Sequence, residues 1–306
     1  MTGYVVRRIL WAIPVLWAIV TITFFLMHAV PGGPFDRDRE LPPAVRANLE
    51  RKYGLDEPLF TQYTTYLTNL VQGDLGVSMR DQRAVTQTIR DGLPVTTQLG
   101  VSAFIFATLF GFTMGLIAAL NHNRFGDYLG VFLATVGSAM PNFILATFLV
   151  ILFSVELGWT DVLGWELFNP RKMILPVIAL GMLPGAYIAR ITRASMLEVL
   201  NQDYVRTARS KGLSEFVVVI RHTVRNALVP VLTVLGPIFA VLVTGSFIIE
   251  TTFGINGVGQ NFVKSIASRD YGVIMGTTIF FAAIVVTANL VVDLMYAVVD
   301  PRIRYQ

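Results

Sequence analysis

The chain has 306 residues, of which 54% are hydrophobic and only 14% are charged, with no cysteine and a formal net charge of +4. This composition is too apolar for an ordinary soluble domain, and the lack of cysteine excludes disulfides and thiolate metal sites. The three histidines, His28, His122 and His222, lie far apart, so no metal site is expected from them.

Six long apolar runs follow one another along the chain, and a helix needs roughly 20 apolar residues to cross the hydrocarbon core of a membrane. Five of the runs reach that length, whereas the fourth is shorter and contains Pro176 and Pro184. The pattern predicts an all-α integral membrane protein with six transmembrane helices. The runs are Ile9–Val30, Thr97–Leu120, Leu129–Val155, Ile174–Ala189, Val229–Ile249 and Val273–Val299.

The connections between the runs divide the chain into three parts. Residues 1–30 hold the N-terminus and the first transmembrane helix, and residues 31–96 form an external subdomain with a helix over Ala44–Tyr53. Residues 97–306 form the transmembrane core, with a large basic loop at 190–228. Because loops rich in lysine and arginine stay in the cytoplasm, both termini are expected there, in a multi-pass protein of the cell (inner or plasma) membrane.

Small and helix-breaking residues interrupt the apolar runs. Gly111 and Gly115 are spaced four apart, which lets two helix backbones approach closely, and Pro141, Pro184 and Pro237 favour kinks. Two interpretations stay open: simple bundle packing, or a gated path along broken helices of the kind that flanks transporter sites. Polar residues at or near membrane depth are costly unless they face protein or water. The candidate path residues are Pro141, Asn142, Asn289 and Asp293.

The basic segment between Asp203 and Pro230 predicts a helix, a tight turn and a second helix. Asn201 or Asp203 can cap the first helix, and Gly212 suits the left-handed position that ends it. Ser214 then caps a second helix that continues until Pro230.

Three partners could explain this segment. A basic amphipathic helix on membrane lipid accounts for the arginines but not for the glycine turn. A nucleic-acid-binding helix-turn-helix has the same local form, yet the segment is tied at both ends to apolar runs and has little reach to a duplex. A knob that docks into a cytoplasmic motor protein accounts for the turn, the charge and the small Ala208 together, because Ala208 leaves room for a partner surface. We prefer this third interpretation.

No catalytic machinery is visible in the chain. It lacks the G-x-x-x-x-G-K-[ST] phosphate loop, and Gly254, Gly257 and Gly259 form a glycine-rich loop without the lysine that should follow. A nucleophile, base and orienting group are also missing as a set. We therefore expect neither an enzyme nor a cofactor in this chain, and energy for any uphill transport must enter through a partner or an ion gradient.

Five stretches together resemble the B-type permease subunit of dipeptide, oligopeptide and nickel ABC importers, a binding-protein-dependent transport family. They occur in the family's order and span nearly the whole chain. They are Arg7–Pro34, Tyr53–Ser78, Asp203–Pro230, Glu250–Gln260 (ETTFGINGVGQ) and Asn289–Tyr305.

This resemblance implies the six-helix fold of type I importer permeases and a set of partners. The partners are a second, similar permease, two ATP-binding subunits that hold ATP and magnesium, and an extracytoplasmic solute-binding protein. The basic loop would be the EAA loop, which couples the permease to the ATPases. The implied coupling residues are Asp203, Tyr204, Arg206, Thr207, Ala208, Arg209, Lys211, Gly212 and Leu213.

The chain departs from the general pattern of that loop. The E-A-A positions six residues before Gly212 hold Arg206, Thr207 and Ala208, so the glutamate and the first alanine are missing. The downstream I-x-L-P is absent at its usual spacing, which falls on residues 222–225. These differences put in question which side chain makes the main ion pair with the ATPase.

The resemblance favours peptides as the transported substrate. Similar proteins carry dipeptides, longer peptides, nickel, glutathione or other small solutes, and selection rests largely with the binding protein. The alternatives are a membrane scaffold or receptor without transport, an importer of nickel or another small solute, and an ion-coupled carrier.

Overall fold

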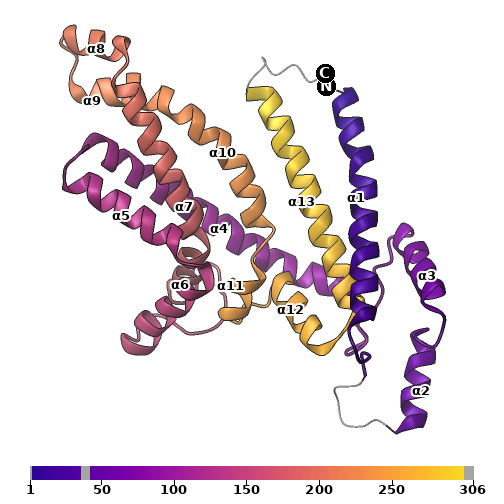
Figure 1. Cartoon of the computed structure of the whole chain (residues 1–306). Helices are drawn as coiled ribbons and strands as arrows, with labels where there is room; N and C mark the ends of the chain where they lie inside the picture. Colours follow the sequence, from indigo (N-terminus) through magenta and orange to yellow (C-terminus); the bar gives the residue numbers. More distant parts are fainter. Residues whose placement is uncertain (1, 36–41, 300–306) are drawn as a thin grey trace. The chain divides into compact units, whose positions relative to one another are not determined.

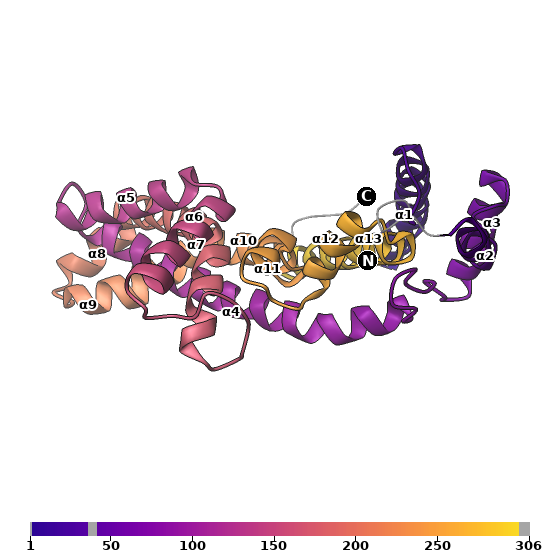
Figure 2. The same ribbon diagram turned by 90° about the horizontal axis from the view of Figure 1, so that it is seen from below.

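The computed structural model describes residues 2–35 and 42–299, with the side chains of residues 2–6, 9 and 292–299 excepted. Throughout these ranges the regular structure is helical, and strand pairing is limited to one isolated bridge between Val77 and Ala84. The described residues divide into two compact units, one of residues 2–96 and 256–290 and the other of residues 97–255 with Val291 onward. Figures 1 and 2 show the helices from two directions.

The helices of the first unit include α1 and α13, which are long and apolar enough to span a membrane. The bounds are α1 (Thr2–Ala29), α2 (Pro43–Lys52), α3 (Leu59–Val71), the start of α4 (Val85–Leu120), α12 (Val258–Ser268) and, as far as Leu290, α13 (Tyr271–Val299).

The second unit contains the rest of α4 and a sequence of helices with two π-helical stretches. The bounds are α5 (Phe125–Ala139), α6 (Asn142–Leu149), η1 (Val150–Glu156), α7 (Pro170–Leu200), α8 (Asp203–Ser210), α9 (Glu215–Val217), η2 (Val218–Val224), α10 (Arg225–Val243) and α11 (Phe247–Thr252).

The helix α3 of the first unit packs on α1 and α13. Val20 and Phe24 of α1 form a buried cluster with Tyr63 of α3 and Met275 of α13, and the hydroxyl groups of Thr21 and Tyr63 lie 2.7 Å apart. The helix expected over Ala44–Tyr53 is confirmed within one residue at each end by α2. Its neighbour α3 was not anticipated.

A buried carboxylate fastens the segment before α4 to the start of α13. Asp270 is 3% exposed and accepts hydrogen bonds from the hydroxyl group of Ser78 and from the backbone N–H of Met79. The guanidinium of Arg80 donates to the carbonyl oxygens of Ser268 and Pro34. These contacts hold the segment before α4 against the junction of α12 and α13.

Close packing of small residues joins α4 to α7 in the second unit. A Cβ atom at Gly111 would lie 2.5 Å from the carbonyl oxygen of Gly185, and one at Gly115 would lie 2.5 Å from that of Ala189. The expected close approach of two backbones at this glycine pair is therefore confirmed, and α7 is the partner helix.

The span expected over Leu129–Val155 is broken rather than straight. The helix α5 ends at Ala139, Pro141 stands at the N-cap of α6, and the two halves meet at an angle of 108°. The expected effect of Pro141 is confirmed. Within the residues that the structure describes, five single helices have the length and apolarity of a membrane span, or six if this bent pair counts as one span, which agrees with the six predicted spans.

The segment 190–228 is mostly helical, and its first part belongs to the preceding helix. The helix α7 continues through Arg190 and Arg193 to Leu200. The charges of these two arginines suggested a loop, but the structure shows them bonded to α5, through Ser138 and Asp127 respectively. A charged side chain that is bonded to a neighbouring helix does not require its own helix to end.

The second helix of the segment does not stop at Pro230, which corrects that prediction. One continuous helical stretch runs from Glu215 to Val243, with Pro230 and Pro237 inside it. A proline removes one backbone hydrogen bond, but a helix within a bundle can tolerate this loss. The stretch ends where Gly245 adopts a left-handed φ of 89°.

Candidate functional site

The helix α8 lies between the end of α7 and the start of the helical stretch that begins at Glu215 (Figure 1). Gln202 is its N-cap residue and makes no side-chain capping bond, so the expected capping by Asn201 or Asp203 is wrong. Asn201 instead ends α7, and its side-chain amide donates to the carbonyl oxygen of Leu197 at 2.9 Å. Asp203 lies in the first turn of α8, and its Oδ1 is 3.7 Å from Nη1 of Arg206.

The inward face of α8 consists of Val205 and Ala208. Val205 is fully buried and Ala208 is 5% exposed, and both pack on Val218 of η2. Ala208 therefore faces its own chain, which corrects the idea that its small side chain leaves room for a partner. Its methyl group instead lets α8 lie close to η2.

The turn after α8 is built as predicted. Gly212 has φ +75°, and no atom lies within 4 Å of the position that a Cβ would occupy. Arg209 donates to both carboxylate oxygens of Glu215, at 2.7 and 3.2 Å, and these hydrogen bonds raise the pKa of Arg209 above its ordinary value. Ser214 is the N-cap residue of α9 but makes no side-chain capping bond. The glycine and the ion pair together fix the angle between the two helices.

The outward face of this tip is exposed and mixes charge with apolar surface. Tyr204 is 42% exposed, and its hydroxyl group accepts a hydrogen bond from Asn226 at 2.8 Å. Leu213 and Phe216 are 41% and 75% exposed. The remaining predicted coupling residues with exposed side chains are Asp203, Arg206, Thr207, Arg209 and Lys211.

Phe216 is a candidate that the sequence did not single out. It lies three residues after Leu213, which precedes the helix, and Ile220 follows Phe216 on the helical stretch with 48% exposure. We call Leu213, Phe216 and Ile220 the apolar rim. An apolar residue two places after the cap Ser214, in an otherwise basic segment, is the signal that could have revealed it.

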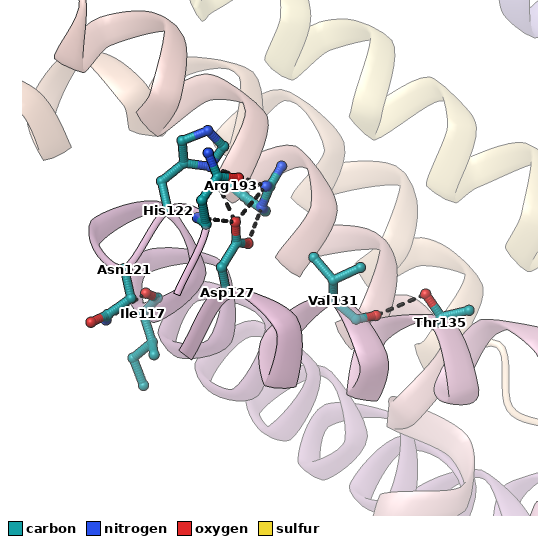
Figure 3. A network of polar contacts seen from close by, with 8 residues as sticks. Ile117, Asn121, His122, Asp127, Val131, Thr135 and Arg193 are labelled. Carbon is teal, nitrogen blue, oxygen red and sulfur yellow. Dashed lines mark hydrogen bonds and ion pairs between the residues drawn. The ribbon is translucent and has the colours of Figure 1, made fainter. Parts of the chain in front are cut away.

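An ion-pair network joins α5 to α7 (Figure 3). Arg193 donates from Nε to Oδ1 of Asp127 at 2.6 Å and from Nη2 to Oδ2 at 2.8 Å. The backbone N–H of Asn123 donates to Oδ2 at 3.0 Å, and Nδ1 of His122 lies 3.1 Å from the same atom. Asp127 is 3% exposed. Sequence inspection missed this pair because its members are 66 positions apart.

The candidate path residues fall in separate parts of the fold. Pro141 and Asn142 form the break between α5 and α6, where Asn142 is half-buried. Asn289 is an exposed residue of α13. Asp293 also belongs to α13, but its side chain lies outside the described residues. Among the side chains that the structure describes, no three histidine or acidic residues come together as metal ligands would.

Two family models cover nearly the whole chain. The model described as "Binding-protein-dependent transport system inner membrane component" matches residues 111–305. The model for the N-terminal part of such membrane components matches residues 1–100.

Two curated proteins resemble the chain over its full length. One is the dipeptide transport system permease protein DppB of Bacillus subtilis (strain 168), 46% identical over 99% of this chain and 98% of that protein. The other is the oligopeptide transport system permease protein OppB of Haemophilus influenzae (strain Rd), 43% identical over 100% of both.

A solved structure shares the fold. In the MetNI methionine ABC transporter, captured in inward-facing conformations, one chain aligns with a TM-score of 0.57 at 16% identity, over 70% of this chain and 97% of that chain. At this identity the likeness shows the fold alone, and it confirms the predicted all-α fold of type I importer permeases.

Proposed function

The chain belongs to the family of inner-membrane components of binding-protein-dependent transport systems, and from that premise we propose that it forms the translocation path of a peptide importer. The names of its full-length relatives, which refer to dipeptide and oligopeptide transport, support peptides as the substrate class. Separate ATP-binding subunits, which hold ATP and magnesium, drive the transport. A second, similar permease and an extracytoplasmic solute-binding protein complete the importer.

The proposed coupling role is supported by the two different faces of α8. Its inward face, Val205 and Ala208, is fixed on η2, while its outward face and the apolar rim remain exposed. Helices that dock into a partner groove typically present apolar anchors beside polar groups. The tip therefore supplies a rigid surface on which an ATPase subunit can push.

The outward face also indicates which residues make the contact. Phe216 and Leu213 are the anchors, because large exposed side chains dominate binding energy when a partner buries them. Arg206 and Lys211 supply positive charge around these anchors. Arg209 is already bonded to Glu215, so it serves the shape of the turn and not the ion pair with the partner.

Asn142 at the broken span supports a location for the path. Half-helix ends and polar residues within a membrane stay stable where they line a cavity. Pro141 and Asn142 place such an end in the second unit. Alternating access would then move this break as the ATPases close and open.

The orientation of the chain in the membrane is inferred from the distribution of its positive charges. The tip of α8 and the short turn before α5 carry Arg206, Arg209, Lys211 and Arg124, so they face the cytoplasm. This orientation places residues 31–96 and the segment around α12 outside, where they meet the solute-binding protein, and it leaves both termini in the cytoplasm.

The test compares two exposed phenylalanines in the reconstituted importer. Phe216 is 75% exposed at the α8 tip, and Phe168 is 85% exposed in the loop before α7. We expect Phe216→Ser to reduce peptide uptake and co-purification of the ATPases about ten-fold or more, as loss of a hot-spot side chain does. Phe168→Ser, the matched control, should leave both unchanged.

Two results would contradict the proposal. Normal ATPase co-purification by Phe216→Ser would refute docking at this tip. If no peptide is found on the cognate binding protein and peptides fail to stimulate ATP hydrolysis, the substrate class is wrong, and nickel, another small solute or a role as scaffold or receptor takes its place.

A further inference from the structure

The ion pair between Asp127 and Arg193 lies on the route from the docking tip to the broken span. We propose that these two side chains are positioning residues that fix the register between α5 and α7, so that displacement of α8 moves the break at Pro141. This inference rests on the proposed docking of α8. It assigns a role in coupling to residues outside the docking segment.

The first step in the argument is the geometry of the pair. Both carboxylate oxygens of Asp127 accept from Arg193, at 2.6 and 2.8 Å, in the two-pronged arrangement that fixes direction as well as distance. Figure 3 shows the carboxylate of α5 facing the guanidinium of α7. The two helices therefore cannot slide past each other at this level without breaking both bonds.

The second step is that Asp127 is itself anchored. Oδ2 also accepts from the backbone N–H of Asn123 at 3.0 Å and lies 3.1 Å from Nδ1 of His122. These residues belong to the turn between α4 and α5. The carboxylate therefore ties three segments together, namely the turn after α4, the start of α5 and the C-terminal part of α7.

The third step is the character of the rest of the contact between α5 and α7. Between the ion pair and Pro141, besides one hydrogen bond from Arg190 to Ser138, it consists mainly of small residues: Ala134 packs with Ala186 and Ala189, and Gly137 lies against Met182. Van der Waals contacts of this kind favour closeness but impose little direction. The ion pair is thus the element that sets the register of the two helices.

The fourth step is the position of the pair along the helices. Arg193 lies seven residues before Leu200, where α7 ends and α8 follows. Asp127 lies in the first turn of α5, whose last residue, Ala139, directly precedes the break at Pro141. Movement of α8 therefore reaches α7, then α5 through the ion pair, and finally the break at Pro141.

A matched control lies one turn away on the same helix. Arg190 of α7 also bonds to α5, through a single hydrogen bond of 2.9 Å from Nη1 to the hydroxyl group of Ser138. This bond joins the same two helices, but its acceptor is neutral and its donor is exposed. Arg190→Met removes an arginine and a bond between the helices without touching Asp127.

The experiment measures ATP hydrolysed per peptide imported by the complete importer in proteoliposomes. We expect Arg193→Met to raise this ratio about five-fold or more, the range of a typical coupling between sites, while ATP hydrolysis continues. Arg193→Lys should give an intermediate ratio, because an ammonium keeps the charge but lacks the planar fork. Arg190→Met should keep the wild-type ratio.

A wild-type ratio in Arg193→Met overturns the inference, and so does an equal rise in Arg190→Met. If Arg193→Met does not assemble, Asp127→Asn replaces it, with the same expected rise and the same refuting result. The docking proposal is judged separately by ATPase co-purification with Phe216→Ser. If Phe216→Ser loses the ATPases while Arg193→Met keeps a wild-type ratio, this inference is rejected and the docking proposal stands.

Discussion

Replacing Gly115 by alanine tests whether the contact between α4 and α7 depends on the missing side chain. A Cβ atom at this position would lie 2.5 Å from the carbonyl oxygen of Ala189 and 2.6 Å from Cβ of Thr192. Neither atom belongs to a flexible chain end, so no rotamer change relieves the overlap. The two helices would have to separate.

The cost follows from that separation. Reaching an ordinary carbon contact of about 3.5 Å requires a local shift of about 1 Å, and such a gap forfeits a quarter to a half of each contact's attraction. Overpacking of this kind costs about 1–3 kcal/mol, and clashes with rigid atoms place Gly115→Ala near the upper end. The better helix propensity of alanine returns about 1 kcal/mol. We therefore expect a net loss of about 2 kcal/mol.

The assay is thermal unfolding of the detergent-solubilised permease, monitored by fluorescence-detected size exclusion. With an unfolding entropy of about 2.1 cal/mol/K per residue over 306 residues, a loss of that size lowers the midpoint by about 3 °C. Gly126→Ala is the control, because the nearest atoms to its Cβ would belong to the side chain of Asn121, at 3.1 Å, and it should unfold no earlier than the wild type. Equal midpoints for Gly115→Ala and the wild type would refute the packing argument.

Four further changes have defined outcomes. Gly212→Ala should destabilise the α8 turn by about 1 kcal/mol, purely through its left-handed φ, and hydrogen exchange in α8 should rise; unchanged exchange would contradict this. Ala208→Trp should expose the segment to proteolysis, because position 208 is buried, whereas intact resistance would mean that the residue faces outward. Arg193→Met should cost up to about 3–5 kcal/mol, because it leaves the charge of Asp127 buried and unpaired. Asp127→Asn should cost less, since the side chain of Arg193 is 28% exposed whereas that of Asp127 is 5% exposed; equal melting shifts would contradict this order. Asp270→Ala should cost about 1–3 kcal/mol by leaving Ser78 and the N–H of Met79 without their acceptor, and a wild-type melting midpoint would show that water replaces it.

Local patterns were sufficient for much of the fold. The apolar runs predicted the number of spans, because a membrane demands a minimum apolar length whatever the tertiary structure. Gly212 and Pro141 were equally readable, since glycine favours a left-handed end and proline breaks a helix through its own covalent geometry.

Features that depend on distant partners could not be read in this way. Pro141 indicates a break, but the angle of 108° between its two halves depends on the contacts of α6 with α7 and α11. Arg190 and Arg193 resembled the beginning of a loop because their partners, Ser138 and Asp127, lie more than 50 positions away. Alanine is compatible with both a buried and an exposed face, so residue type alone could not show which way Ala208 points.

The two faces of α8 have a consequence for how importers of this kind diversify. Val205 and Ala208 hold the helix to its own chain, while Arg206, Thr207 and Ser210 stand free of that packing. Substitutions at the three outer positions can accumulate at little cost to folding. With α8 docked as proposed, a duplicated permease changes its choice of ATPase subunit through a few surface replacements. The inner pair would stay constant as that specificity drifted.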